Sequence, residues 1–322
     1  METITLGRTG LRVSRIAYGT WQLGGEWGTF DEDAAVAAIG HARDLGVNFF
    51  DTAQAYGFGA SEELLGRALR PVLKSDRDSV VIATKGGVRE GGGRDASPDA
   101  LRRGVESSLR ALGIETIDLY QVHWPDPRVP QEETAGALRD LVDEGKIRHV
   151  GVSNYDVAQM TAFARVRPVE TLQPPYHLFR RGIEADVLPY AAEHDIGVLA
   201  YSPLASGLLT GRVDENTTFA DDDWRSRSSA FTGDALKRNV AVVHRLERFA
   251  AEHGIAIGQL AIAWVLARPG VHAAIVGARS ARHIADSAAA TDVHLSSADM
   301  SEIDRLTADA VPIEGATPEG VL

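Results

Sequence analysis

Short apolar runs alternate along this chain with longer segments in which apolar residues recur at the spacing of a helix face. The short runs have the length of buried strands and are bounded by turn residues. We therefore predict eight strands, at residues 15–19, 47–51, 80–84, 117–122, 148–152, 170–173, 197–201 and 273–277.

The longer segments carry the residues that begin and end helices. Asp31 and Ser97 can cap a helix N-terminus, and Pro98 suits a first helical position. Gly46 and Gly113 suit the left-handed residue at which helices commonly end. Helices are predicted within residues 31–46, 97–113, 183–197, 234–254 and 257–270.

The order of these elements indicates the fold class. Strand–helix alternation over about 260 residues predicts a (β/α)8 TIM barrel, preceded by a small β-hairpin at residues 4–14. A doubly wound sheet is the alternative, and it requires a G-x-G-x-x-G turn after its first strand. The nearest match, GFGASE at 57–62, lacks the third glycine and follows the second strand.

No linker or shift in composition divides the chain, so we interpret residues 1–322 as one domain. The glycine-rich segment 85–95 and the acidic segment 220–229 are predicted to be mobile loops on the face of the barrel.

Composition argues against several classes of function. The formal net charge of −12 disfavours nucleic-acid binding, which needs a basic surface, and disfavours anionic membranes. The absence of cysteine excludes disulfides, thiolate catalysis and cysteine-ligated zinc. The N-terminus has no signal-peptide pattern, and no apolar stretch has the length of a membrane span. We therefore expect a soluble, cytoplasmic protein.

Four polar residues stand at or just beyond the ends of neighbouring predicted strands: Asp51, Tyr56, Lys85 and His123. Taken alone, each has an ordinary structural explanation: Asp at a strand end forms turns, Tyr packs, Lys at a strand end usually points to water, and His there is usually a structural residue with its hydrogen bonds satisfied. In a barrel, however, catalytic groups gather at the C-terminal ends of the strands. The coincidence of all four at one end favours a catalytic site.

These four groups suit protonation of a carbonyl oxygen. Tyrosine has a reference pKa of ~10, and lowering it by about three units requires roughly 4 kcal/mol of preferential phenolate stabilisation. One ammonium about 4 Å away supplies that at an effective dielectric of ~20, and Lys85 is the candidate. Asp51 would hold Lys85 in place, and His123 would orient the substrate oxygen.

The attacking group at the carbonyl carbon is then the open question. No activated serine is indicated, since GVSNY at 151–155 departs from G-x-S-x-G, so a cofactor hydride is expected. A metal-dependent barrel hydrolase is a weaker alternative. Asp126 beside His123 is a possible ligand pair, but no third ligand is indicated and the Lys85 ammonium would repel a cation.

Several motifs of the chain resemble those of the aldo-keto reductases over essentially its whole length. They are FFDTAQAYG with SEELLG, VIATKGG, IDLYQVHWPD, GKIRHVGVSNY, LQPPYHLF, YSPLASGLLTGR and AIVGARS. The chain looks most similar to the bacterial inositol-operon and general-stress reductases, relatives of the voltage-gated potassium channel β subunits. This resemblance implies a (β/α)8 barrel whose bottom is closed by the N-terminal hairpin, and a catalytic tetrad of Asp51, Tyr56, Lys85 and His123.

The resemblance also implies a nicotinamide dinucleotide that extends across the barrel mouth. Ser153, Asn154 and Gln173 match the residues that hold the carboxamide, although Ser153 and Asn154 could instead cap a helix. Tyr201 matches the aromatic residue that stacks on the nicotinamide ring. The loop 202–212 would wrap the pyrophosphate, and the loop after the first strand would touch the ribose side. The further contacts implied are Gly19, Thr20, Trp21, Asp51, Ser202, Pro203, Leu204, Ser206, Gly207, Leu208 and Arg212.

Residues 274–287, which include Gly277, match the adenosine end of the cofactor. Arg279 and Ser280 lie where a helix is predicted to begin, and an arginine at a helix N-terminus suits a phosphate. This favours NADPH over NADH, although a surface arginine at a helix cap would look the same. The family often has Gln and Asn where this chain has His283 and Ser287, and this departure leaves NADH possible.

The predicted substrate pocket has an aromatic wall of Trp21, Trp27, Phe58, Trp124 and Trp224. Packing at the barrel rim would also explain each ring. Such a wall suits a small-molecule aldehyde or ketone with a flat or apolar part, and sugar-derived, quinone and pyridoxal-like carbonyls all remain candidates. The main hypothesis is an NADPH-dependent carbonyl reductase. The alternative is a cofactor-binding regulatory or redox-sensing subunit with slow turnover.

Overall fold

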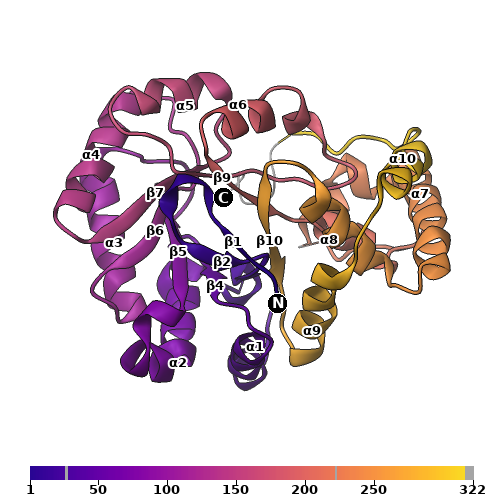
Figure 1. The fold of residues 1–322 in the computed structure, drawn as a ribbon, viewed down its shortest axis with the longest axis horizontal. Helices are drawn as coiled ribbons and strands as arrows, with labels where there is room; N and C mark the ends of the chain where they lie inside the picture. Colours follow the sequence, from indigo (N-terminus) through magenta and orange to yellow (C-terminus); the bar gives the residue numbers. More distant parts are fainter. Residues whose placement is uncertain (26–27, 222, 316–322) are drawn as a thin grey trace.

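The computed structural model describes residues 1–25, 28–221 and 223–315, and its centre is a closed barrel of eight parallel strands (Figure 1). Around the barrel the strands follow one another in chain order, and β10 closes the ring between β9 and β3. The predicted TIM barrel is therefore confirmed. The strands are β3 (Ile16–Gly19), β4 (Phe49–Asp51), β5 (Val81–Gly86), β6 (Ile117–Val122), β7 (Ile147–Ser153), β8 (Thr171–Gln173), β9 (Gly197–Tyr201) and β10 (Val271–Gly277).

Helices surround the barrel, and α7 and α10 pack against each other beyond this ring (Figure 1). Asp31 caps α1 as predicted, because its Oδ1 accepts from the Ala34 N–H at 3.1 Å. Ser97 precedes α3 but does not cap it; its hydroxyl donates to Asp95 Oδ1 at 2.6 Å instead. The helices are α1 (Glu32–Asp44), α2 (Ala60–Ser75), α3 (Pro98–Leu112), α4 (Gln131–Asp143), α5 (Val157–Ala164), α6 (Val187–Glu193), α7 (Gly233–Glu252), α8 (Ile257–Ala267), α9 (Ala281–Ala288) and α10 (Ser297–Leu306).

The strands are apolar on both faces because each face meets a different core. In β3, Ala17 belongs to the cluster inside the barrel, whereas Ile16 and Tyr18 belong to the cluster between the strands and the helices. Phe49 and Phe50 divide in the same way on β4. This double burial explains why the strands appear in the sequence as continuous apolar runs.

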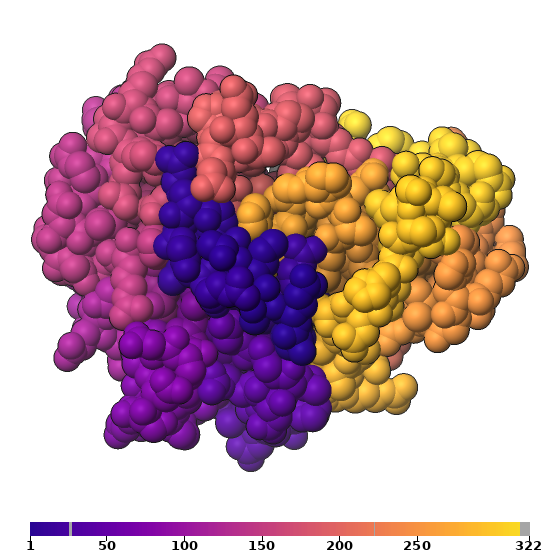
Figure 2. Space-filling view, in the orientation of Figure 1, coloured from indigo at the N-terminus to yellow at the C-terminus, as the bar shows by residue number. Residues whose placement is uncertain are grey.

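The N-terminal hairpin closes the bottom of the barrel. It pairs β1 (Thr3–Thr5) with β2 (Arg12–Ser14), and it contributes the buried side chains of Leu6 and Val13 to the cluster inside the barrel. Leu6 lies so close to Gly197 that a methyl group on Gly197 would come within 2.6 Å of Leu6 Cδ1. In the space-filling view this segment covers the middle of the molecule (Figure 2).

Among the described residues, no single helix combines the length and apolar character needed to cross a membrane. Taken together, α7 and α8 pass a test of length and composition, but they are bent by 89° relative to each other.

Candidate active site

The side chains of Asp51 and Lys85 meet inside the mouth of the barrel. They lie at the C-terminal ends of the adjacent strands β4 and β5 and point to the barrel interior. Lys85 Nζ donates to Asp51 Oδ2 at 2.7 Å and to the backbone oxygen of Thr52 at 2.9 Å. Lys85 is 0% and Asp51 2% exposed. A buried ion pair is a poor source of stability, so its presence here points to function.

The phenol of Tyr56 lies against this pair. Tyr56 belongs to the loop between β4 and α2 and is 3% exposed. Lys85 Nζ donates to its hydroxyl oxygen at 3.2 Å and lies 4.9 Å from the centre of its ring. The loop is anchored at its far end, where the buried Ser61 hydroxyl donates to Thr20 Oγ1 at 2.7 Å. Tyr56 is therefore held with its oxygen beside the ammonium.

His123 completes the group from the next strand. It directly follows β6, and its backbone N–H donates to Gly86 O at 2.9 Å. The imidazole is 1% exposed and stands edge-on to the Tyr56 ring, with the ring centres 5.7 Å apart. The structure thus brings together all four residues that the sequence singled out.

A chain of hydrogen bonds extends from Asp51 around the mouth of the barrel. Gln173 Nε2 donates to Asp51 Oδ1 at 2.9 Å, and the Ser153 hydroxyl donates to Gln173 O at 2.8 Å. Asn154 donates to Ser153 Oγ at 3.0 Å and accepts from the Tyr201 hydroxyl at 2.8 Å. This network joins the ends of β4, β7, β8 and β9. It therefore fixes Ser153, Asn154 and Gln173, the predicted carboxamide contacts, in position relative to the Tyr201 ring.

Strained backbone is concentrated at the same end of the barrel. Asn154, Ser202, Ala205 and Ser206 all have positive φ although none is glycine. Such conformations cost on the order of 1–3 kcal/mol each and recur at functional sites. Alternation of right- and left-handed residues also turns successive N–H groups toward one side, which suits an anion.

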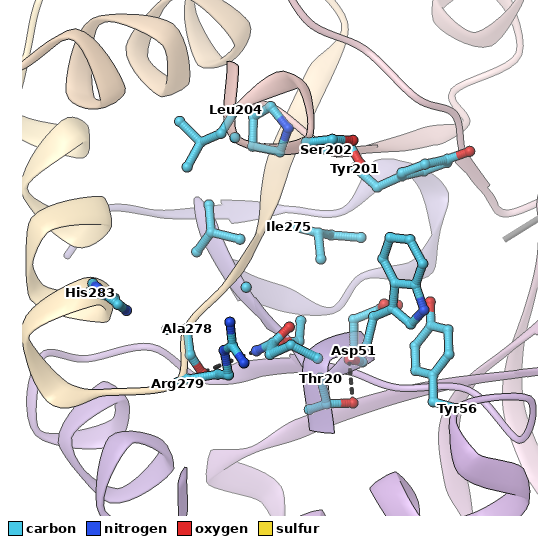
Figure 3. A pocket seen from close by; sticks show the side chains of 18 of the residues that line it. Thr20, Asp51, Tyr56, Tyr201, Ser202, Leu204, Ile275, Ala278, Arg279 and His283 are labelled. Atoms are coloured by element: carbon cyan, nitrogen blue, oxygen red, sulfur yellow. Dashed lines mark hydrogen bonds between the residues drawn. The ribbon is translucent and has the colours of Figure 1, made fainter. Parts of the chain in front are cut away.

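A cleft crosses the mouth of the barrel and encloses about 280 Å³. Asp51 and Tyr56 lie at one end, with Tyr201 across from them on the opposite wall, Arg279 and His283 lie at the other end, and Ile275 lies between the two ends (Figure 3). The predicted cofactor residues that line this cleft are Gly19, Thr20, Trp21, Asp51, Gln173, Tyr201, Ser202, Pro203, Leu204, Ser206, Gly207, Gly277, Arg279 and His283.

The remaining predicted cofactor residues lie around the cleft. Arg212 and Ser287 line a neighbouring hollow that shares Leu204, Gly277 and His283 with it. Leu208 is fully buried beneath the loop, and Ser280 caps α9 by accepting from the His283 N–H at 3.4 Å. Ser153 and Asn154 are connected to the cleft through Gln173 and Tyr201.

The aromatic residues predicted to form a substrate pocket are separated in the structure. Trp21 lines the cleft, with its ring centre 6.4 Å from that of Tyr56, and Trp224 lines a small hollow beside it. Trp124 packs under the Arg94 guanidinium at 4.9 Å rather than along the cleft. Phe58 lies on a different hollow, 43% exposed and with a φ of 45°. Trp27 lies outside the described residues.

Several residues of the site have no clear signal in the sequence. Gln22 lines the cleft and donates to Gly19 O at 2.9 Å and to Ala278 O at 3.0 Å, so it joins the loops that follow β3 and β10. Its position directly after Trp21 is the only clue. Ile275, Val276 and Ala278 also line the cleft; they fall within the segment 274–287 matched to the cofactor, but no property of the individual residues singles them out.

A buried acid lies on the outer side of β5. Glu62, in the first turn of α2, is 1% exposed and accepts from Thr84 Oγ1 at 2.6 Å. Thr84 precedes Lys85 and faces the opposite side of the strand, so this bond fixes α2 to the strand that carries the ammonium. Burial raises the pKa of Glu62.

Asp126 does not face His123 as a metal ligand. Its carboxylate accepts from the Arg128 side chain at 2.8 and 3.0 Å, and this hydrogen bonding holds its pKa below the usual range. Within the ranges that the structure describes, no group of three or more His, Asp or Glu side chains is placed to hold a metal ion.

Comparison with known proteins gives consistent results. The model of the aldo/keto reductase family matches residues 15–308. The aldo-keto reductase YhdN of Bacillus subtilis is 41% identical over 97% of this chain and 95% of its own length. The NADH-specific methylglyoxal reductase of Escherichia coli is 32% identical over 94% of this chain and 97% of its own length. The solved structure of the glycerol dehydrogenase AKR11B4 from Gluconobacter oxydans superposes with a TM-score of 0.89 at 40% identity, and the match covers 98% of both chains.

Proposed function

The chain belongs to the aldo/keto reductase family, and from this premise we propose that it reduces an aldehyde or ketone to an alcohol with NADPH. One observation carries the proposal: the buried Lys85 ammonium is hydrogen-bonded to both the Asp51 carboxylate and the Tyr56 phenol at the end of the cleft. A bound nicotinamide cofactor supplies a hydride to the carbonyl carbon. The protein must then deliver a proton to the carbonyl oxygen.

Tyr56 is the proposed proton donor, and Lys85 makes it a better one. An ammonium 3.2 Å from the phenol oxygen stabilises the phenolate by about 5 kcal/mol at an effective dielectric of ~20. The Asp51 carboxylate opposes part of this effect but keeps the ammonium in position. His123 stands edge-on to the phenol, where it can orient the carbonyl oxygen beside the Tyr56 hydroxyl.

The donor set of the cleft fits a dinucleotide. Amide and hydroxyl groups of Ser153, Asn154 and Gln173 suit a carboxamide, and the Tyr201 ring offers a flat face for the nicotinamide. The left-handed turns at Ser202 and Ser206 present backbone N–H groups suited to a pyrophosphate.

The choice of NADPH rests on the far end of the cleft. Arg279, Arg212 and Arg282 line this region, and their guanidinium groups favour the additional 2′-phosphate of NADPH. Asp286 lies 3.8 Å from Arg282 and offsets part of that charge. Because one relative is named NADH-specific, NADH is tested beside NADPH.

The test follows cofactor oxidation by absorbance with a panel of aldehydes, ketones and quinones, for the wild type and for Tyr56→Phe. Loss of general acid catalysis should lower kcat by about 10²–10⁴-fold. The dissociation constant for NADPH, measured by fluorescence, should change less than about threefold, because the phenol oxygen is not needed to hold the cofactor. Equal turnover by the phenylalanine variant would show that Tyr56 is not the proton donor.

A further inference from the structure

A small hollow adjoins the cleft on the side away from the proposed adenosine end. The two share the residues Trp21, Tyr201, Ser202 and Ser206 as walls. The opposite wall of the hollow includes Arg180, Trp224 and Glu314. Assuming the reductase function proposed above, we propose that Arg180 binds an anionic group of the substrate, so that the preferred substrates are aldehydes or ketones carrying a carboxylate.

Arg180 is a half-buried cation held in a defined position. It lies in the connection between β8 and α6, where its N–H donates to His177 O at 2.8 Å in a tight turn. Its Nη2 donates to Gly315 O at 2.7 Å. Burial lowers the pKa of this guanidinium, but arginine remains charged in proteins. The turn and the bond to Gly315 therefore fix a positive charge at the edge of the hollow.

The neighbouring arginine forms two close ion pairs, whereas Arg180 forms none within the part of the chain that the structure describes. Arg181 donates to Glu184 Oε1 at 2.7 Å and to Asp304 Oδ1 at 2.7 Å. In contrast, none of the carboxylates in the described residues lies within 4.0 Å of the Arg180 guanidinium, and Glu314 acts on it only from a longer distance. A partly desolvated cation without a carboxylate partner gains most from a carboxylate brought by a ligand.

Three further side chains, Trp224, His177 and Glu314, line the hollow. The buried Nε1–H of Trp224 has no acceptor among the residues that the structure describes. His177 also lines the hollow, and burial, with the Arg180 charge as a second cause, lowers its pKa to about 3. It is therefore neutral near pH 7. Glu314 is the opposing group, because its carboxylate lies on the same wall.

The size of the hollow fits a single carboxylate. It encloses about 50 Å³, and ~10–15 Å³ of such space holds one water. Trp21 lies between the hollow and the phenol, with its ring centre 6.4 Å from that of Tyr56. A spacer such as the aromatic ring of 4-carboxybenzaldehyde, or the short aliphatic chain of an ω-oxo acid, would let one substrate place its carboxylate in the hollow and its carbonyl at the phenol.

The test compares 4-carboxybenzaldehyde with its neutral methyl ester, methyl 4-formylbenzoate, in wild type, Arg180→Gln and Arg180→Lys. A hydrogen bond to a charged group is worth 10- to 100-fold in binding. The ratio of kcat/KM for acid over ester should fall by that factor in Arg180→Gln, mainly through KM. Lysine should restore part of it, because it keeps the charge but loses the planar fork.

Arg181→Gln is the matched control. It also removes one arginine charge, but from the neighbouring residue, whose guanidinium is already paired with Glu184 and Asp304. The acid-to-ester ratio should remain within about twofold of the wild type. Glu314→Gln should change the acid-to-ester ratio in the opposite direction, about two- to fivefold in favour of the acid. Because this variant keeps the Arg180–Gly315 bond, it still tests the proposal if Arg180→Gln fails to fold. An unchanged ratio in Arg180→Gln, or an equal loss in Arg181→Gln, overturns the proposal.

A binding measurement separates this inference from the proposed reductase function. 4-Carboxybenzoate, which cannot be reduced in this way, is titrated into the protein saturated with NADP⁺, and tryptophan fluorescence is followed. Binding that weakens at least tenfold in Arg180→Gln supports the anion site even if no carbonyl compound is turned over. Binding that is absent in the wild type, or unaffected by the substitution, overturns it.

Discussion

Replacing Asp51 by asparagine tests whether the buried ion pair is as costly to break as its geometry implies. Lys85 is fully buried, and its ammonium has the Asp51 carboxylate at 2.7 Å as its ion-pair partner. Asparagine keeps the size of the side chain and an oxygen acceptor but removes the negative charge. The substitution therefore leaves a buried, uncompensated ammonium.

The expected loss follows from the distance. Two unit charges 2.7 Å apart attract by about 6 kcal/mol at an effective dielectric of ~20. Lys85 keeps its hydrogen bonds to Thr52 O at 2.9 Å and to Tyr56 Oη at 3.2 Å, which offset part of that loss. We expect the free energy of unfolding to fall by about 3–5 kcal/mol, the range for breaking a buried pair.

The assay is urea unfolding followed by circular dichroism and by tryptophan fluorescence, at pH 7. Lys85→Met should lower the free energy of unfolding by a similar amount, because it leaves the buried Asp51 carboxylate without its ion-pair partner. The double variant Asp51→Asn/Lys85→Met should cost less than the sum of the two by at least about 2 kcal/mol, since no unpaired charge remains. A loss below about 1 kcal/mol in Asp51→Asn, or strict additivity, would refute the reasoning.

Two further predictions concern stability. Because burial raises the pKa of Glu62, the folded state keeps a proton that the unfolded state has released, and the free energy of unfolding should fall by about 1.4 kcal/mol per pH unit from about pH 4.5 up to the raised pKa. Glu62→Gln should remove this slope in urea titrations, and identical slopes would contradict the assignment. Leu6→Ala should lower the free energy of unfolding by about 2–5 kcal/mol, whereas the exposed control Thr5→Ala should change it by less than ~0.5 kcal/mol; similar losses would show that Leu6 does not seal the barrel.

Much of the fold was predictable because each strand is buried on both faces. That condition produces the continuous apolar runs, and the eight predicted strands all occur, with no end shifted by more than two residues. β5, for example, extends to Gly86, and β10 begins at Val271. Because Asp51 and Lys85 stand at the ends of predicted strands, and a TIM barrel gathers the C-terminal strand ends at one mouth, the location of these two side chains was also predictable.

Side chains on loops could not be placed in the same way, because their positions depend on contacts distant in sequence. Phe58 has a left-handed backbone conformation and lies away from the cleft, and a phenylalanine in the sequence gives no indication of such a conformation. Arg180 is fixed by Gly315, 135 residues further along the chain. In the sequence, Glu62 looks like an ordinary acidic residue in the first turn of a helix, where a negative charge is favourable. Only the packing of α2 on β5 shows that this carboxyl group is buried.

The two ends of the barrel differ in role: the bottom contributes stability, and the mouth carries the groups proposed for chemistry. At the bottom, Leu6 and Val13 join the apolar cluster inside the barrel and exclude water from below. At the mouth, the chain carries an ion pair and several strained residues that cost stability. The first arrangement makes the second effective, because an ammonium acts on a phenol far more strongly in a dry, low-dielectric interior than in water. The apolar hairpin is therefore part of the proposed proton-donating device, although it lies at the opposite end of the strands that carry Asp51 and Lys85.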